Sequence, residues 1–517
     1  MSKEELDTMA IIDIGSYAIK MKIVEIDNKG NLKEIDNLRR AASIGSDTFA
    51  IGKVSFKKVD EICNVLRNYK DVMDEYGVNI YKAVATSAIR EADNREYIID
   101  QIKINTGLDI EIISSSEEKY YTYKGIREKN NNFRKFRTEG SLIVDIGAGG
   151  TEIAMYNNNK LAFSQNISIG SLRIRELLWE LERETLDFSH IIEEFVEGNI
   201  DSLRIFKPRI KLNYFVAIGG EISVISRICN DTKEKSKLNY ISKKDFLEVY
   251  KKVMYTPVHI LAREYNIQET RAELLLPSMI IFKKFLDMTK SDGIYAPLVS
   301  LRDGIIVDYI DKNYDVKKHI RFSKDIISAA TYLAKRYKAD LNHARDVKRK
   351  SEIIFDSMKD IHGLGERERF LLKISAILHD IGKFINIVNH YTNSYKIIMS
   401  SDIIGISKKE MEIIANIAGY HSVVTPNMSH KNYRALNEKD RVKTSKLIAI
   451  IRIADSLDRS HKQKIKISNI TLEDKVLTIE AKIKEEASLE EWTFKRKSEF
   501  FKEVFGINTV IKLKRRL

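Results

Sequence analysis

Cysteine, proline and tryptophan are scarce in this chain of 517 residues, which has two, five and two of them. Cys63 and Cys229 lie far apart and outside any CxxC pattern, which excludes a disulfide framework and a cysteine-based zinc site. The few prolines, with 43% hydrophobic and 31% charged residues, exclude a fibrous or disordered chain. The length predicts roughly three or four globular domains.

Long hydrophobic runs are also missing. The longest apolar stretches, which begin at Leu274 and Leu447, fall far short of the ~20 residues that a bilayer span needs. The N-terminus is acidic where a signal peptide would be basic, and Asp13 interrupts the apolar stretch that follows. We therefore expect a cytoplasmic enzyme or binding protein with no membrane partner.

Positive charge is in excess, since 87 Lys and Arg residues outnumber 74 Asp and Glu residues and give a net charge of +13. An anionic partner (nucleic acid, membrane surface or phosphate polymer) and a background preference for lysine explain this equally well. Histidine is unevenly distributed, because seven of the ten follow residue 340, where metal chemistry could be assembled. They are His343, His379, His390, His421, His430, His461 and His362.

Two segments about 130 residues apart share one predicted order of strand, turn and strand. Residues 10–27 read as an apolar strand, a tight Asp-x-Gly-Ser turn and a second alternating strand. Residues 141–156 repeat it with a glycine-rich turn. Strand and helix signals alternate around both copies, which predicts a duplicated pair of α/β domains with mixed or parallel sheets covered by helices.

The pattern changes near Ser323, where successive amphipathic helices follow without a clear strand signal. The last segment returns to alternation, with a hairpin in 464–483, a helical stretch and a closing strand. We predict α/β domains at 1–135 and 136–312, a helical domain at 313–465 and a small α+β segment at 466–517.

The two turns suit phosphate chemistry. Asp13 and Asp145 each end a strand that is followed by glycine, which lets backbone N–H groups converge on an anion while the aspartate holds Mg²⁺. Arg90 at a strand end could clamp phosphate oxygens, and Glu118 at another could deprotonate a water. For each of the latter two, an ordinary exposed side chain is the alternative.

Ordered segments across residues 10–306 resemble the exopolyphosphatase and guanosine pentaphosphate phosphatase (Ppx/GppA) family, which has the actin-like ATPase (ribonuclease H-like) fold. They are AIIDIGSYAIKMKIVEI, AVATSAIREADN, GLDIEIISSSEE, LIVDIGAGGTEIAMY, SIGSLRIREL, AIGGEISVISRI, and RAELLLPSMIIF with LVSLRDGII. The resemblance continues more loosely into the helical region. It implies a homodimer and phosphoryl transfer by positioning and charge neutralisation.

By this resemblance Glu118 is the catalytic glutamate that activates water, and Arg90 lies in the phosphate site. Asp145 is associated with the essential Mg²⁺, and Glu152 lies beside it. The implied phosphate-binding residues are Asp13, Gly15, Ser16, Gly147, Ala148, Gly149, Gly150, Thr151, Gly219 and Gly220. The chain departs from the family pattern at Tyr17, Ala18, Gly150 and Glu221, which affects affinity and substrate choice.

A second site is predicted in the helical region. His379 and Asp380, with His343 upstream and Asp455 downstream, resemble the HD metal-dependent phosphohydrolase domain, whose His, His-Asp and Asp ligands bind a divalent metal. Mn²⁺ or another divalent cation is the expected metal. His390 and His421 are interpreted as ordinary core or surface histidines, with a second metal as the alternative.

The favoured hypothesis is an exopolyphosphatase that uses Mg²⁺ to remove terminal phosphate from inorganic polyphosphate. One alternative is hydrolysis of the 5′ γ-phosphate of guanosine pentaphosphate at the same site. Another is a nucleotide phosphohydrolase working through the HD site, with the N-terminal domains as a phosphate sensor, and a third is a non-catalytic regulator. Nucleic acid is not an expected partner.

Overall fold

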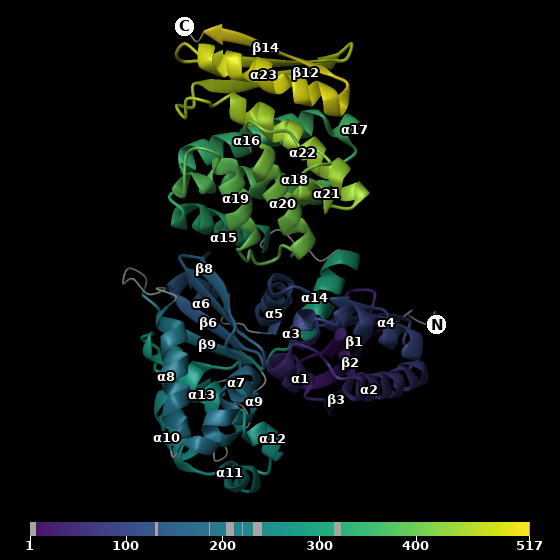
Figure 1. Ribbon diagram of the computed structural model, residues 1–517, viewed down its shortest axis with the longest axis vertical. Helices are drawn as coiled ribbons and strands as arrows, with labels where there is room; N and C mark the ends of the chain where they lie inside the picture. The colour runs from purple at the N-terminus through teal and green to yellow at the C-terminus, as the bar shows by residue number, and fades with distance from the viewer. Residues whose placement is uncertain are drawn as a thin grey trace. The chain divides into compact units, whose positions relative to one another are not determined.

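The computed structural model forms two compact units, Met1–Asp325 (unit 1) and Ile326–Leu517 (unit 2) (Figure 1). Within the described residues, no helix has both the length and the apolar character needed to cross a membrane. The described residues are 7–129, 133–185, 187–202, 211–219, 221–230, 240–314 and 322–515.

The first sheet of unit 1 has five strands in the order β3-β2-β1-β4-β5. The neighbours of β1 run antiparallel on the β2 side and parallel on the β4 side. Six of the eight residues of β1 are buried, because helices cover both faces of this central strand. The strands are β1 (Asp7–Ile14), β2 (Ala18–Ile26), β3 (Leu32–Ala41), β4 (Ile80–Ala85) and β5 (Ile110–Ile112).

The second sheet of unit 1 has six strands in the order β10-β11-β9-β6-β7-β8. Apart from the edge strand β10, it repeats the first, since β6 pairs antiparallel with β7 and parallel with β9. The strands are β6 (Ser141–Ile146), β7 (Thr151–Asn157), β8 (Lys160–Ile167), β9 (Tyr214–Gly219), β10 (Tyr240–Ser242) and β11 (Gly293–Tyr295). The mixed α/β architecture predicted from the repeated turns is therefore confirmed.

Helices cover both faces of the first sheet. Ile62 and Leu66 of α2 pack with Ile12 on one face, whereas Tyr121 of α5 and Ile305 of α14 belong to the cluster on the other. The helices of unit 1 are α1 (Ile44–Ile51), α2 (Phe56–Glu75), α3 (Ser87–Glu91), α4 (Arg95–Thr106), α5 (Ser115–Lys129), α6 (Phe133–Glu139), α7 (Ser171–Glu184), α8 (Phe188–Asp201), α9 (Ile222–Cys229), α10 (Lys243–Tyr255), α11 (Val258–Glu264), α12 (Glu269–Ala272), α13 (Leu275–Asp287) and α14 (Leu301–Asn313).

Unit 2 is mainly helical, as predicted. The helices α16, α18, α20 and α22 pack against one another and bury an aliphatic core (Figure 1). From α15 on, the helical elements are α15 (Phe322–Arg336), α16 (Leu341–Ser357), α17 (Lys359–His362), α18 (Glu366–Leu378), η3 (Ile381–Phe384), α19 (His390–Met399), α20 (Lys408–Tyr420), α21 (Lys431–Arg434), α22 (Glu438–Ser456) and α23 (Ser488–Phe505).

A three-stranded sheet closes the chain, in the order β12-β13-β14. Its strands are β12 (Ile465–Glu473), β13 (Val476–Ile483) and β14 (Asn508–Arg515). Alternate residues of β13 are buried, while α23 packs against β14, which matches the predicted strand, helix and strand signals. The four-part division of the chain, and the ribonuclease H-like and HD-like assignments, stay predictions.

Candidate phosphate-binding site and a histidine–aspartate cluster

The first predicted turn joins β1 to β2. Asp13 is buried near the end of β1, and the Gly15 N–H donates to the Ala18 carbonyl at 3.1 Å, which closes the turn. The Ser16 hydroxyl lies 2.8 Å from the Ser87 hydroxyl and accepts from the Ala88 N–H. The turn is therefore fixed to the start of α3, the short helix that carries Arg90.

The second turn joins β6 to β7. Asp145 lies on β6, and the Gly147 N–H donates to the Gly150 carbonyl at 2.8 Å. Side chains are excluded at Gly149, where a Cβ would lie 2.6 Å from the Phe49 ring. Both predicted turns thus end central strands, and both expose backbone to one region of unit 1.

Arg90 and Glu118 approach each other at this region. We expected Arg90 in a loop, but its N–H donates to the Thr86 carbonyl and the segment forms the one-turn helix α3. Its guanidinium donates to the Ile113 carbonyl at 2.8 Å and lies 3.4 Å from a Glu118 carboxylate oxygen. Glu118 is in the first turn of α5.

A cavity of about 360 Å³ collects most of the predicted residues. A smaller cavity of about 50 Å³ shares Glu118, Asp145 and Gly147 with it and adds Arg90. The larger cavity is lined by Asp13, Gly15, Ser16, Glu118, Asp145, Gly147, Ala148 and Gly219, and the smaller also by Gly149, Gly150 and Glu152. Residues of six elements, β1, α3, α5, β6, β7 and β9, therefore line these two adjoining cavities.

The larger cavity is lined by four carboxylates (Asp13, Glu118, Asp145 and Glu221) and by four cationic side chains (Lys20, Arg39, Arg271 and Arg302). Burial raises the pKa of Glu118 above its ordinary value, and the charge of Arg90 offsets this only in part. Burial, reinforced by the carboxylate of Glu118, raises the pKa of Asp145 to about 7. Lys20 Nζ lies 3.8 Å from the Asp13 carboxylate. A divalent cation beside Asp145 would relieve this crowding of like charges.

Glu152 and Thr151, which were both predicted as site residues, contact other residues of unit 1. The Glu152 carboxylate lies 2.5 Å from the ammonium of the buried Lys119. The Thr151 side chain is fully buried, and its hydroxyl donates to the Ile169 carbonyl. Asp145 is therefore a better candidate ligand for Mg²⁺ than Glu152, because one Glu152 oxygen is already neutralised by Lys119.

The third predicted turn follows β9. Gly219 has φ +121°, and a Cβ there would lie 2.1 Å from the Ile146 carbonyl, so glycine is required. Gly220 lies outside the described residues. Glu221 is buried, lines the cavity, and accepts from the Ser171 and Ser278 hydroxyls at 3.4 Å each. Burial raises the pKa of Glu221.

Helix α14 holds α5, and with it Glu118, in place. The Lys124 ammonium donates to the Asp308 carboxylate at 2.6 Å and lies 3.0 Å from that of Asp311. A Cβ on Gly304 would lie 1.7 Å from the Tyr121 carbonyl oxygen, so the two helices approach each other closely, and they lie side by side in Figure 1.

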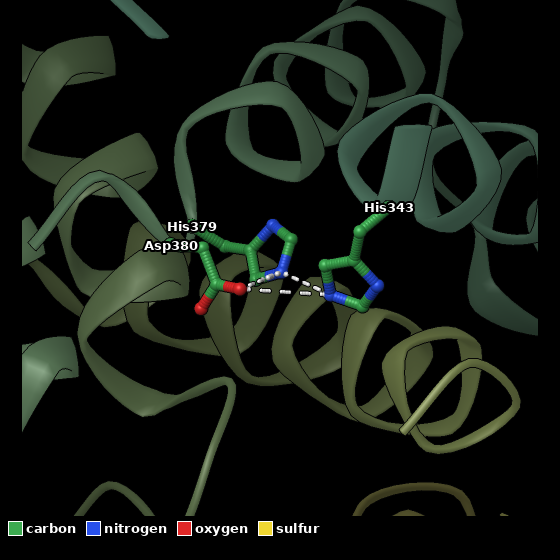
Figure 2. Close-up of side chains that lie close together, drawn as sticks. All are labelled: His343, His379 and Asp380. Carbon is green, nitrogen blue, oxygen red and sulfur yellow. Dashed lines mark hydrogen bonds and ion pairs between the residues drawn. The ribbon is translucent and has the colours of Figure 1, made fainter. Parts of the chain in front are cut away.

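The four residues predicted as the metal site of unit 2 are brought together and are all buried. The Nε2 atoms of His343 and His379 are 3.1 Å apart, and each lies 3.6 Å from an Asp380 oxygen (Figure 2). Asp455 Oδ1 lies 3.2 Å from His343 Nε2. Side chains from α16, α22 and the end of α18 thus converge on one point.

Sequence reasoning left two further residues of this cluster unassigned. His390 and His421 are buried, and with Asp380 they form a second group whose ligand atoms lie close together. The structure gives them one feature in common with His379, because the Nδ1 atom of each of the three faces the carbonyl three residues earlier. All three occupy helix ends, where an imidazole can reach that carbonyl.

The fold and the cavity define a mixed α/β protein in which glycine turns and buried carboxylates line one hollow. Comparison with known families gives a sharper assignment. The family model described as "Ppx/GppA phosphatase family" matches residues 22–313 of this chain. A second family model, "Ppx/GppA phosphatase, domain III", matches residues 327–498. The chain belongs to the Ppx/GppA phosphatase family, as its motifs indicated.

Curated relatives of this chain include proteins named as a phosphatase and as a pyrophosphatase. A bifunctional 3-dehydroquinate synthase/phosphatase of Fusobacterium nucleatum is 25% identical over 57% of this chain and 45% of its own length. A guanosine-5′-triphosphate,3′-diphosphate pyrophosphatase of Photobacterium profundum is 20% identical over 79% of each. The matched part thus spans less than half of the first relative.

Solved structures agree on the fold of unit 1. The crystal structure of an exopolyphosphatase from Cytophaga hutchinsonii has a TM-score of 0.51 and 19% identity, covering 59% of this chain and 98% of that one. At this identity the likeness concerns the fold alone.

Proposed function

We propose that this protein hydrolyses phosphoanhydride bonds, and that its substrate is inorganic polyphosphate, from which it removes the terminal phosphate. The observation that carries the proposal is the cavity of unit 1, where Glu118, Arg90 and Asp145 meet beside three glycine turns. The net charge of +13 supports a polyanionic substrate.

Different groups of the cavity bind the phosphate, activate the water and hold the cation. Backbone N–H groups of the turns and the Arg90 guanidinium bind the terminal phosphate and orient it. Glu118 accepts a proton from the attacking water, a role that the raised pKa of its carboxyl group favours. Asp145 would hold Mg²⁺, which neutralises charge on the phosphoryl oxygens.

The test measures phosphate release from long-chain polyphosphate and from guanosine pentaphosphate with Mg²⁺. We expect the parent to cleave polyphosphate and Glu118→Gln to lose at least ~100-fold in kcat while still binding it, because the variant lacks only the base. Glu111→Gln removes an exposed carboxylate on β5 outside the cavity and serves as the matched control.

Two results would reject this proposal: no turnover of either substrate by the parent, or undiminished turnover by Glu118→Gln. If the parent cleaves guanosine pentaphosphate and leaves polyphosphate intact, the cavity belongs to a nucleotide hydrolase and the polyphosphate assignment is wrong.

A further inference from the structure

The two cavities of unit 1 meet at the proposed reaction centre. Glu118, Asp145 and Gly147 line both of them, so the proposed base and the candidate Mg²⁺ ligand stand at their common boundary. The larger cavity has a volume of about 360 Å³ and the smaller one about 50 Å³. A phosphate that reacts at this boundary therefore has free volume on two sides.

The smaller cavity is too small for a polymer. A water-sized position takes about 10 to 15 Å³ of such volume, so about 50 Å³ offers roughly four positions. One orthophosphate, whose oxygens are each about the size of a water molecule, matches this space. The rest of a polyphosphate chain fits only the larger cavity, where positive charge is supplied by Lys20, Arg39, Arg271 and Arg302.

The charges around the smaller cavity are compatible with an anion. Among the described residues, four carboxylates line it, and three of them have a cationic partner within unit 1. The pairs are Glu91 with Arg173, Glu118 with Arg90, and Glu152 with Lys119. The fourth carboxylate, Asp145, is the candidate ligand of Mg²⁺. Uncompensated negative charge therefore does not close this cavity to phosphate.

Lys119 places a buried cation on this side of the reaction centre. It follows Glu118 on α5, its side chain is 1% exposed, and it lines the smaller cavity without lining the larger one. Burying an ammonium group costs free energy unless an anion compensates its charge, and Glu152 does so here. Arg90 likewise lines only the smaller cavity. Two cationic side chains thus lie where a polymer does not fit.

Hydrolysis changes the charge at the boundary between the cavities. In the proposed reaction the water oxygen bonds to the terminal phosphorus, the bond from that phosphorus to the bridging oxygen breaks, and the bridging oxygen keeps the electron pair on the polymer. A proton of the water passes to Glu118, whose carboxylate becomes neutral. Arg90 then loses the charge of its partner, and the newly formed orthophosphate can replace it.

We propose that the smaller cavity receives the orthophosphate product, bound by Lys119 and Arg90, while the shortened polyphosphate stays in the larger cavity. This inference rests on the proposed function and adds to it a separate product site. With the product on the far side of Glu118, the next phosphate of the polymer can advance to the base without dissociation of the chain.

The test measures orthophosphate binding to the full chain by isothermal titration calorimetry, with Mg²⁺ and without polyphosphate. We expect Lys119→Met to weaken binding at least ~10-fold, because it removes a charge-assisted hydrogen bond. Glu152→Gln should tighten binding, because it removes the carboxylate that competes for the Lys119 ammonium. An ion pair with only a structural role predicts weaker binding in both variants, and that result would overturn the proposal.

Lys22→Met is the matched control. Lys22 is a buried lysine of unit 1 that forms ion pairs with Glu34 and Asp303 and lines neither cavity. Its replacement should leave the orthophosphate affinity as in the parent. Equal weakening in Lys22→Met and Lys119→Met would show that any lost ion pair of unit 1 has this effect, and would overturn the product site.

Product inhibition of the parent gives a second readout that needs no variant. The shortening of polyphosphate is followed on gels at increasing concentrations of added orthophosphate. We expect noncompetitive inhibition, because orthophosphate in the smaller cavity binds together with the polymer. Competitive inhibition would overturn the product site. If the parent binds orthophosphate through Lys119 but leaves polyphosphate intact, the polyphosphate assignment is wrong and the smaller cavity remains an orthophosphate site.

Discussion

At the residue scale, Arg90 is the cation nearest the proposed base. Its Nη1 atom donates to the Ile113 carbonyl and to Glu118. The rest of the planar guanidinium offers further N–H groups in a fixed fork, which the single ammonium of lysine does not have. We expect Arg90→Lys to lower kcat/KM for polyphosphate by roughly 100-fold, because lysine keeps the positive charge but loses the planar fork of donors that orients the phosphate.

The measurement is steady-state phosphate release. Arg67→Lys is the control, because Arg67 lies on α2, bonds to Asn64 in an exposed position and does not line the cavity. Partial recovery of Arg90→Ala by added guanidinium would tie the loss to the missing group, whereas equal losses in both lysine variants would contradict the assigned role.

Some of these residues could be predicted from the sequence and others could not. Asp13 and Asp145 each follow an apolar strand and precede glycine, so local pattern sufficed to place them. Arg90 and Glu118 needed the family resemblance, because their meeting depends on how β4 and β5 pair. His390 and His421 depended on the packing of α19 against α20, which no local pattern specifies.

At the element scale, boundaries followed local signals closely. The hairpins β1–β2 and β6–β7 were predicted, because their apolar alternation and glycine turns act over a few residues. The short helix α3 was missed, since a single turn leaves no periodicity to detect. It is stabilised here by the hydrogen bond that the Ala88 N–H donates to the Ser16 hydroxyl.

The contact of α5 with α14 gives an element-scale prediction. Gly304→Ala places a Cβ against the Tyr121 carbonyl, so α14 must move away from the helix that carries Glu118. We expect a cost of about 3 kcal/mol in the stability of unit 1, with a loss of turnover larger than the loss of polyphosphate binding. Differential scanning fluorimetry and phosphate release measure the two effects.

Gly198→Ala is the control for that change. Gly198 lies within α8, and a Cβ there meets nothing within 4 Å, so alanine should stabilise the helix by up to about 1 kcal/mol. If Gly304→Ala behaves like Gly198→Ala, the close approach of α14 does not position Glu118.

At the scale of the whole molecule, we expect the two units to prefer different cations. The carboxylate oxygens in the cavity of unit 1 are the ligand type that Mg²⁺ prefers, whereas the imidazoles of unit 2 suit transition metals. Dimer formation, implied by the family resemblance, stays a prediction.

This division predicts where a transition metal stabilises the chain. Mn²⁺ at 100 times its dissociation constant should raise the free energy of unfolding of unit 2 by about 2.7 kcal/mol, because it binds the cluster only when unit 2 is folded. Hydrogen exchange of the full chain, read by mass spectrometry, should slow by roughly 100-fold in peptides of α16 and α22, which carry His343 and Asp455. Peptides of α2 in unit 1 should exchange as before, since α2 lines neither cavity described there. Equal slowing in α2 and α16, or none in α16 and α22, would show that the cluster is not where Mn²⁺ acts.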